Sequence, residues 1–378
     1  MGQTPSDLQL AAVVEDFRSG SPSQELLDRF LTGLAPWGEV ARPMRGGVIV
    51  HSRDGSGADD LARRAADFGV ASAKKLAEAV SFARAILFVP RDAGARPPDS
   101  GALEELLGAA PRGARVFVAG RLGRDAASAR RAIDLARSRG LAIAAGGYMP
   151  FTWRLPAVDV PFGARLTHAL VAPVGDPGAA EYHGLEALLA LTARREGGER
   201  GVAAVTARAG AFVWQMVERD AQLRRLFEAA VSRSDSPQGD ALTDGRTQDI
   251  VGLGIVPKLA RDPIAWEIEH ADGLRSALVV LNGVVADSNF AVRESSGRIT
   301  SAQLYLPPAP GRHYWTALAR RAHSFLAGGP PPWPAERTVL LDGLLAALEA
   351  ARASPGERAP AKDLAIAYAA APESQFER

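Results

Sequence analysis

The 378-residue chain carries 44 basic and 43 acidic residues, and a net charge of +1 gives no electrostatic basis for binding nucleic acid or an anionic membrane. It contains no cysteine, which excludes disulfides, thiol nucleophiles and cysteine-ligated metal sites. No basic region leads into an apolar segment at the N-terminus, and no apolar run approaches membrane-spanning length, so a soluble, cytoplasmic protein of two domains is expected.

The first part of the chain alternates short apolar runs with amphipathic stretches, the pattern of a doubly wound parallel α/β domain. Strands are predicted at 8–14, 47–51, 84–89, 116–119 and 141–145, and helices at 24–34, 58–68, 73–80, 103–107 and 125–139. The hydroxyl of Ser23 is the expected N-cap of the first helix. We therefore place an N-terminal domain at residues 1–147, with its ligand beyond the carboxyl ends of the strands.

The second part changes character after residue 147. Strands are predicted at 166–174 and 202–208, helices at 179–195 and 211–231, and a polar surface loop or mobile lid at 232–246. Four strands then follow at 264–270, 274–282, 284–292 and 299–306, which predicts an antiparallel meander with one face open to a partner or ligand. Helices at 314–326 and 337–353 close an α+β domain at 148–353, and residues 354–378 return to the fold as a strand (364–368) and a tail.

Four sequence segments, in this order and spacing, resemble segments of the glucose–fructose oxidoreductase, inositol dehydrogenase and rhizopine catabolism (Gfo/Idh/MocA) family. They are Leu61–Val70 with Ala73–Val80, Val116–Gly147, Glu181–Glu186, and Trp333–Ala353 followed by Asp363–Tyr368. The resemblance implies a Rossmann-like domain, a second domain with a large open, mostly antiparallel sheet, NAD(P)-dependent oxidoreduction, and a homodimer or higher oligomer formed through that sheet.

The turn that should hold the dinucleotide departs from the family. Family members bind the pyrophosphate with a glycine-rich turn after the first strand, where backbone N–H groups can approach it. Here residues 14–23 contain one glycine and two carboxylates, and Pro22 removes an N–H donor. Arg18 and Ser19 could still hold an anion, and Arg53 or Asp54 could contact a ribose, although an Asp-Gly turn is the simpler interpretation there. NAD(P) is therefore disfavoured, and the cofactor stays unknown.

The family's hydride-transfer motif is also altered. Where the family has Glu-Lys-Pro, this chain reads Ala119-Gly120-Arg121. In the family the lysine polarises oxygen and relays a proton, which Gly120 cannot do. Arg121 is always charged and is a poor acid–base group, but it could bind a carboxylate or phosphate of a substrate.

The substrate side follows the family more closely. His183 and Glu186 lie three apart on one predicted helix face and match the family's His-x-x-Asp pair, which predicts a catalytic role; a structural histidine is the alternative. Four residues at the domain junction and one on the meander are candidate substrate ligands, with packing as the alternative for the aromatics. They are Tyr148, Thr152, Trp153, Arg154 and Asn282. No histidine pair has metal-ligand spacing, so no metal site is predicted.

Three functions follow from these observations. The first is a family-like protein that binds a polar sugar- or cyclitol-like molecule between its domains without ordinary hydride transfer, as a non-redox enzyme or pseudoenzyme. The second is an atypical NAD(P)-dependent oxidoreductase in which His183 relays the proton. The third is a structural partner in a dimer. Whether the protein is an enzyme is left open by the sequence.

Overall fold

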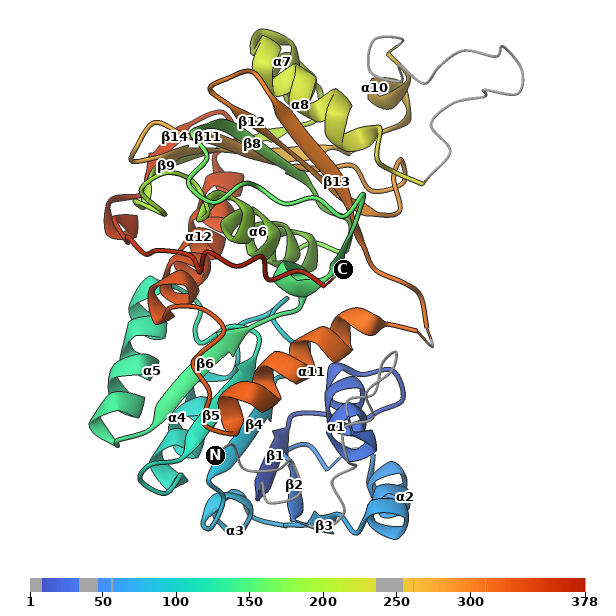
Figure 1. The fold of residues 1–378 in the computed structure, drawn as a ribbon, viewed down its shortest axis with the longest axis vertical. Coiled ribbons are helices and arrows are strands. Elements are labelled where there is room, and N and C mark those ends of the chain that lie inside the picture. The colour runs from blue at the N-terminus through green and yellow to red at the C-terminus, as the bar shows by residue number, and fades with distance from the viewer. Residues whose placement is uncertain are drawn as a thin grey trace. The chain divides into compact units, whose positions relative to one another are not determined.

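The computed structural model describes residues 9–33, 47–55, 57–235, 254–260, 262–309 and 311–377 (Figure 1). The chain divides into two compact units. The N-terminal unit contains residues 1–148 and 307–342, and the C-terminal unit contains residues 149–306 and 343–378. Residues 307–342, which the sequence analysis assigned to the second domain, are thus grouped with the first. Helix α12, Ala335–Ala353, contributes residues to both units.

A six-stranded parallel sheet forms the centre of the N-terminal unit. Its strands are β1 (Leu10–Val14), β2 (Val48–Ser52), β3 (Ala71–Ser72), β4 (Ala85–Val89), β5 (Arg115–Ala119) and β6 (Ala142–Gly146). The order β3-β2-β1-β4-β5-β6 reverses between β1 and β4, and all pairs are parallel. Strands β1 and β4 are apolar and buried along their whole length, as expected for a sheet covered on both faces. The predicted doubly wound domain is confirmed.

The helices of this unit follow the predicted pattern with local differences. They are α1 (Pro22–Thr32), α2 (Ala58–Phe68), α3 (Leu76–Val80), α4 (Ser100–Ala109), α5 (Ala126–Ser138) and α11 (His313–Leu326). The N-cap of α1 is Ser21 rather than Ser23, because the Ser21 side chain accepts the Gln24 N–H. Helix α3 is shorter than predicted, since β3 pairs with β2 immediately before it. Residues 8 and 34, at the ends of two predicted elements, lie outside the described residues.

An eight-stranded mixed sheet forms the centre of the C-terminal unit. Its strands are β7 (Trp153–Leu155), β8 (Leu166–Ala172), β9 (Val202–Ala209), β10 (Ile264–His270), β11 (Arg275–Val280), β12 (Ser288–Glu294), β13 (Ile299–Tyr305) and β14 (Arg358–Pro360). The predicted simple meander is wrong at one point, because β8 inserts between β11 and β12 and pairs parallel to β11. The predicted strand at 364–368 is also wrong: Lys362–Leu364 is a 3-10 turn, and the closing strand is β14.

The long helix predicted at 211–231 is two helices, α7 (Ala211–Arg219) and α8 (Ala221–Val231). Asp220 separates them with an extended backbone, φ −112° and ψ 101°, and its carboxylate accepts the N–H groups of Gln222 and Leu223 at 2.9 and 3.1 Å. The aspartate therefore ends one helix and caps the next. Most of the predicted loop at 232–246 lies outside the described residues.

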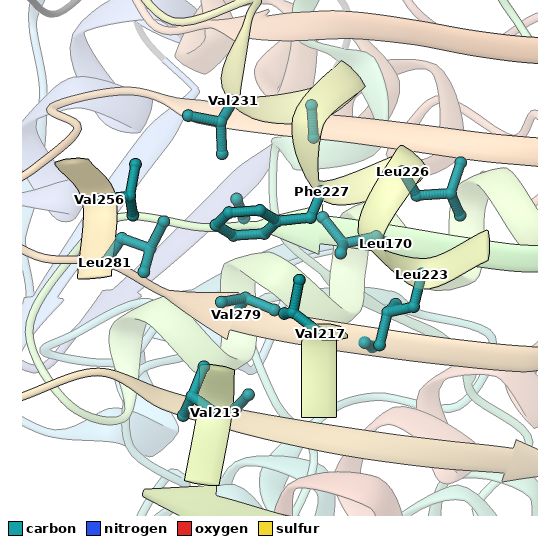
Figure 2. Packing of buried hydrophobic residues seen from close by; sticks show 14 of the residues in the cluster. Leu170, Val213, Val217, Leu223, Leu226, Phe227, Val231, Val256, Val279 and Leu281 are labelled. Atoms are coloured by element: carbon teal, nitrogen blue, oxygen red, sulfur yellow. The ribbon is translucent and has the colours of Figure 1, made fainter. Parts of the chain in front are cut away.

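One face of the eight-stranded sheet is covered by the helices α7, α8 and α10 (Ile255–Leu259), which we call the helical cap. Figure 2 shows Phe227 of α8 packed among apolar side chains of the sheet, such as Leu170 and Val279, which are fully buried. Helix α6 (Ala179–Thr192) packs on β8 and β11, on the other side of the sheet in Figure 1. The prediction of an open outer face is therefore wrong over the capped area. In the described ranges no helix is both long and apolar enough to cross a membrane.

Candidate functional site

The turn after β1 uses its own side chains to satisfy its backbone donors. Pro22 begins α1 without an N–H, and the Ser21 hydroxyl accepts the Gln24 N–H at 3.3 Å. The Gln24 side-chain oxygen in turn accepts the N–H of Gly20, the one glycine of the turn, at 2.5 Å. A pyrophosphate binds by accepting such N–H groups. The N–H groups of Gly20 and Gln24 are therefore engaged by side chains of the turn itself.

Charge and packing in this turn also oppose a dinucleotide. Asp16 is buried and forms an ion pair with Arg18, and the hydrogen bond to Asp16 raises the pKa of Arg18. Phe17 is fully buried and fills the space beside the strand end. Ser19 is exposed. A buried carboxylate and a buried aromatic ring thus stand where a glycine-rich turn would expose backbone N–H groups.

The two predicted ribose contacts have partners within the unit. Arg53 lies 3.5 Å from a carboxylate oxygen of Glu105, and Asp54 accepts a hydrogen bond from Arg91 at 2.9 Å. Ser56, which completes this turn, lies outside the described residues. Both side chains thus form partly exposed ion pairs within the N-terminal unit.

Gly120 stands at the position of the family's lysine, and the space around it is closed. Its φ is +139°, a conformation that residues with a side chain rarely adopt. A Cβ at this position would lie 2.8 Å from the Gly94 nitrogen and 2.9 Å from the Ala93 carbonyl carbon. The loop after β4 therefore occupies the volume that a lysine side chain would need.

Arg121 pairs with a carboxylate of the protein itself, that of Asp342. Its Nε lies 3.3 Å from Asp342 Oδ1, and Asp342 Oδ2 accepts the N–H groups of Leu122 and Gly123 at 3.0 and 2.9 Å. Asp342 is completely buried, and burial raises its pKa to about 7 against the opposing effect of these donors. The sequence analysis missed Asp342, although an aspartate within the apolar run 339–348 signals a buried charge with a partner.

His183 and Glu186 both lie on α6, as predicted. Glu186 is fully buried, and burial lowers the pKa of His183 to about 4, so the imidazole is neutral at pH 7. The ring of His183 contacts that of Tyr182 at 5.2 Å between centroids. A neutral imidazole can accept a proton.

Two predicted substrate ligands are engaged in aromatic packing. The ring of Tyr148, in the N-terminal unit, lies 4.6 Å from that of Tyr314 and 4.9 Å from that of Trp315. Trp153, in the C-terminal unit, stacks on Tyr305 with centroids 6.2 Å apart. The packing interpretation accounts for both side chains.

Two further candidates hold the C-terminal unit together. Thr152 donates its hydroxyl to the Tyr305 carbonyl at 2.6 Å. Arg154 is buried, forms an ion pair with Asp159, and lies 5.4 Å from the ring of Phe290 and 4.4 Å from that of Phe376. Burial lowers the pKa of Arg154, although Asp159 opposes this effect. Both side chains therefore have structural roles.

Asn282 borders a hollow of about 900 Å³ in the C-terminal unit, which we call the C-terminal hollow. Its amide exchanges hydrogen bonds with the backbone of Gly175, with distances of 2.7 and 3.3 Å. Apolar groups such as Ala180, Ile264 and Val280 form part of the wall. Four charged side chains complete it: Glu181, Lys258, Asp262 and Arg352.

Glu181 and Arg352 form an ion pair at the wall of this hollow. Glu181 is almost completely buried, and its carboxylate also accepts the N–H of Gly178, at 2.5 Å, at the start of α6. Arg352 comes from the end of α12 and remains partly exposed. The hollow thus combines an apolar wall with fixed hydrogen-bond donors and acceptors, the composition of a site for a small polar ligand.

A second polar constellation is structural. Ser276 Oγ lies 2.8 Å from His270 Nε2, and His270 Nδ1 lies 3.2 Å from Glu199 Oε1, the order of groups in a hydrolytic triad. All three residues are buried, and none borders the C-terminal hollow. Burial alone would raise the pKa of Glu199, but hydrogen bonds from His270 and Arg195 lower it to about 2. Without access for a substrate, this network fastens β10 to the residues that precede β9.

Within the described ranges, no group of three or more histidine, aspartate or glutamate side chains could hold a metal ion.

The two sheets define the class of fold. The strand order of the N-terminal unit and the mixed eight-stranded sheet of the C-terminal unit make up the two-domain fold of the Gfo/Idh/MocA dehydrogenases. The resemblance predicted from the sequence is confirmed for the fold.

Solved structures of that class match the chain over nearly its whole length. GenD2 from gentamicin A biosynthesis, solved in complex with NAD, is 17% identical with a TM-score of 0.59, covering 95% of this chain and 98% of GenD2. A putative myo-inositol dehydrogenase from Sinorhizobium meliloti 1021 is 14% identical with a TM-score of 0.56, covering 93% and 99%. A scyllo-inositol dehydrogenase from Lactobacillus casei is 11% identical with a TM-score of 0.57, covering 94% and 99%. No family model and no curated protein sequence matches the chain.

Proposed function

We propose that this protein binds a polar, sugar- or cyclitol-like small molecule in the C-terminal hollow and does so without a dinucleotide. It would be a non-redox enzyme or a pseudoenzyme built on a dehydrogenase fold. Two of the fold neighbours are inositol dehydrogenases, which supports a cyclitol-like ligand at the level of the fold. The argument for this chain comes from its own residues.

The observation that carries the proposal is the closed space at Gly120. A hydride transfer of the family type needs an acid–base group beside the reacting hydroxyl. At Gly120 the backbone of Ala93 and Gly94 leaves no room even for a Cβ. In the turn after β1, side chains independently engage the N–H groups of Gly20 and Gln24. Both features support the proposal that the protein works without a dinucleotide.

The charges of the C-terminal hollow favour a neutral, hydroxyl-rich ligand. Glu181 and Asp262 balance Lys258 and Arg352 along the wall, so a ligand with a net charge gains little. The Arg352 guanidinium can donate hydrogen bonds to one hydroxyl of the ligand, and the neighbouring Glu181 carboxylate can accept one from an adjacent hydroxyl. The apolar wall beside Ile264 and Val280 suits the C–H face of a saturated ring.

Calorimetric titration with neutral cyclitols and hexoses, with no dinucleotide present, tests this proposal. We expect saturable binding of at least one of them. Arg352→Gln should weaken that binding by about tenfold or more, equivalent to about 1.4 kcal/mol, because the hollow loses charged donors. Arg358→Gln is the matched control, since Arg358 forms an exposed ion pair with Glu269 and does not border the C-terminal hollow. Absence of binding, or equal loss in both variants, would contradict the proposed site.

A further inference from the structure

The turn between β5 and α5 surrounds a single carboxylate with donors. Both Leu122 and Gly123 donate their N–H groups to Asp342 Oδ2, at 3.0 and 2.9 Å, while the Arg121 guanidinium lies 3.3 Å from Oδ1. Arg121 is held in place by a second hydrogen bond, from its Nη2 to the Arg124 carbonyl at 3.0 Å. Arg121 and Asp342 are both buried. All of these groups belong to the N-terminal unit.

This arrangement has the composition of an oxyanion site. Successive backbone N–H groups that point to one side form a concave nest for an anion, and a guanidinium beside them adds a charge-assisted bond. Above its pKa of about 7, as at pH 8, the Asp342 carboxylate is ionised and only accepts hydrogen bonds, so it then matches all three donors. The turn also lies at the carboxyl end of a parallel strand, where open α/β sheets bind their ligands. In this protein the carboxylate bound at the turn is that of Asp342, a residue of α12.

Helix α12 is fastened so that Asp342 stays in the nest. Trp333, just before the helix, donates its indole N–H to the Ala145 carbonyl at 2.6 Å, and Thr338 donates its hydroxyl to the same oxygen at 3.2 Å. A Cβ on Gly146 would lie 2.1 Å from the Trp333 ring, so the glycine at the end of β6 is what allows this approach. The chain therefore places its own carboxylate where an external anion could otherwise bind.

We propose that residues 121–123 form an oxyanion nest for a small carboxylate and that Asp342 is its built-in occupant. When this carboxylate is removed, the nest takes up an external monocarboxylate such as formate or acetate. The proposal concerns the N-terminal unit and does not depend on the ligand of the C-terminal hollow. In this proposal Arg121 binds the carboxylate in the nest rather than a substrate, because its guanidinium forms one wall of the nest.

Chemical rescue of the full-length Asp342→Ala variant tests the proposal. Thermal unfolding is followed at pH 8, where formate is ionised, in sodium formate or in sodium chloride of equal ionic strength. We expect formate to raise the unfolding midpoint of Asp342→Ala saturably, by roughly 3 °C or more, because a ligand that binds only the folded state stabilises it. The wild-type protein should respond to formate and chloride alike, since its nest is occupied.

Two further variants separate a filled nest from a general salt effect. Asp342→Ala combined with Arg121→Gln should lose the rescue, because the guanidinium is missing. Asp134→Ala removes an exposed carboxylate of α5 that pairs with Arg137, and formate should not stabilise it specifically. If Asp342→Ala does not accumulate as folded protein, the yield of refolding from urea in formate and in chloride replaces the midpoint. Equal effects of formate and chloride on Asp342→Ala would overturn the proposal.

Discussion

At the scale of single residues, Gly120 shows why the loss of the family's lysine is more than a missing functional group. The residue has φ +139° and lies against the backbone of Ala93 and Gly94. Restoring a side chain there requires the loop after β4 to move. The packing of the N-terminal unit therefore opposes any side chain at residue 120.

Gly120→Ala should destabilise the protein by about 2–4 kcal/mol, because it adds a clash to an unfavourable backbone conformation. Gly108→Ala is the matched control: Gly108 lies in α4 with open space around its Cα, and alanine there should stabilise by about 0.5–1 kcal/mol. Urea unfolding measures both changes. A neutral Gly120→Ala would show that the loop yields easily and that the site is not closed.

Asp342 makes the stability of the protein depend on pH. Its folded-state pKa, raised to about 7 by burial, exceeds the ordinary value of 3.8, so the folded protein retains a proton that the unfolded chain releases. This contribution is complete below about pH 4 and is lost as the pH rises through about 7. Wild-type protein should lose more unfolding free energy than Asp342→Asn between pH 5 and pH 8, by an amount of order 1 kcal/mol or more. Parallel pH profiles for the two proteins would contradict the raised pKa.

At the scale of elements, the helical cap determines which surface of the eight-stranded sheet is available. Phe227, Leu226 and Val231 of α8 are buried against the sheet. At the end of α8, Arg233 donates a hydrogen bond to the Ser301 hydroxyl at 3.0 Å, which fastens the cap to β13. A homodimer through the sheet, expected from the family, would have to use the area outside the cap.

Phe227→Ala should lower the free energy of unfolding by about 3–5 kcal/mol, because it leaves a cavity between α8 and the sheet. Phe212→Ala on α7 is the matched control, since its side chain is 62% exposed, and it should change stability by less than about 0.5 kcal/mol. Denaturant unfolding of the two variants distinguishes them. Equal small effects would mean that the cap contributes little to the fold.

The elements also show what the sequence could and could not predict. The bounds predicted for the strand Ile264–His270 are those observed, because apolar and polar side chains alternate from Trp266 to Glu269 and turn residues bound the strand. The break at Asp220 was missed, since periodicity continues across it and only the capping bonds end the helix. The insertion of β8 between β11 and β12 was also missed, because local patterns do not specify which distant strands pair.

At the scale of the whole molecule, the sequence predicted the two kinds of sheet, one parallel and one mostly antiparallel. The glycine-poor turn and the missing lysine can be read directly from the amino-acid sequence. The closure around Gly120 and the occupation of the nest by Asp342 cannot, because both depend on contacts between segments far apart in the chain. The candidate ligands Thr152 and Arg154 have structural partners for the same reason.

The central claim is that the Rossmann-like unit does not bind a dinucleotide. Calorimetric titration of the full-length protein with NAD+, NADH, NADP+ and NADPH tests it most directly. We predict no saturable binding of any of the four up to millimolar concentration. Tight binding of one of them would contradict the account and would favour an atypical oxidoreductase in which His183 relays the proton.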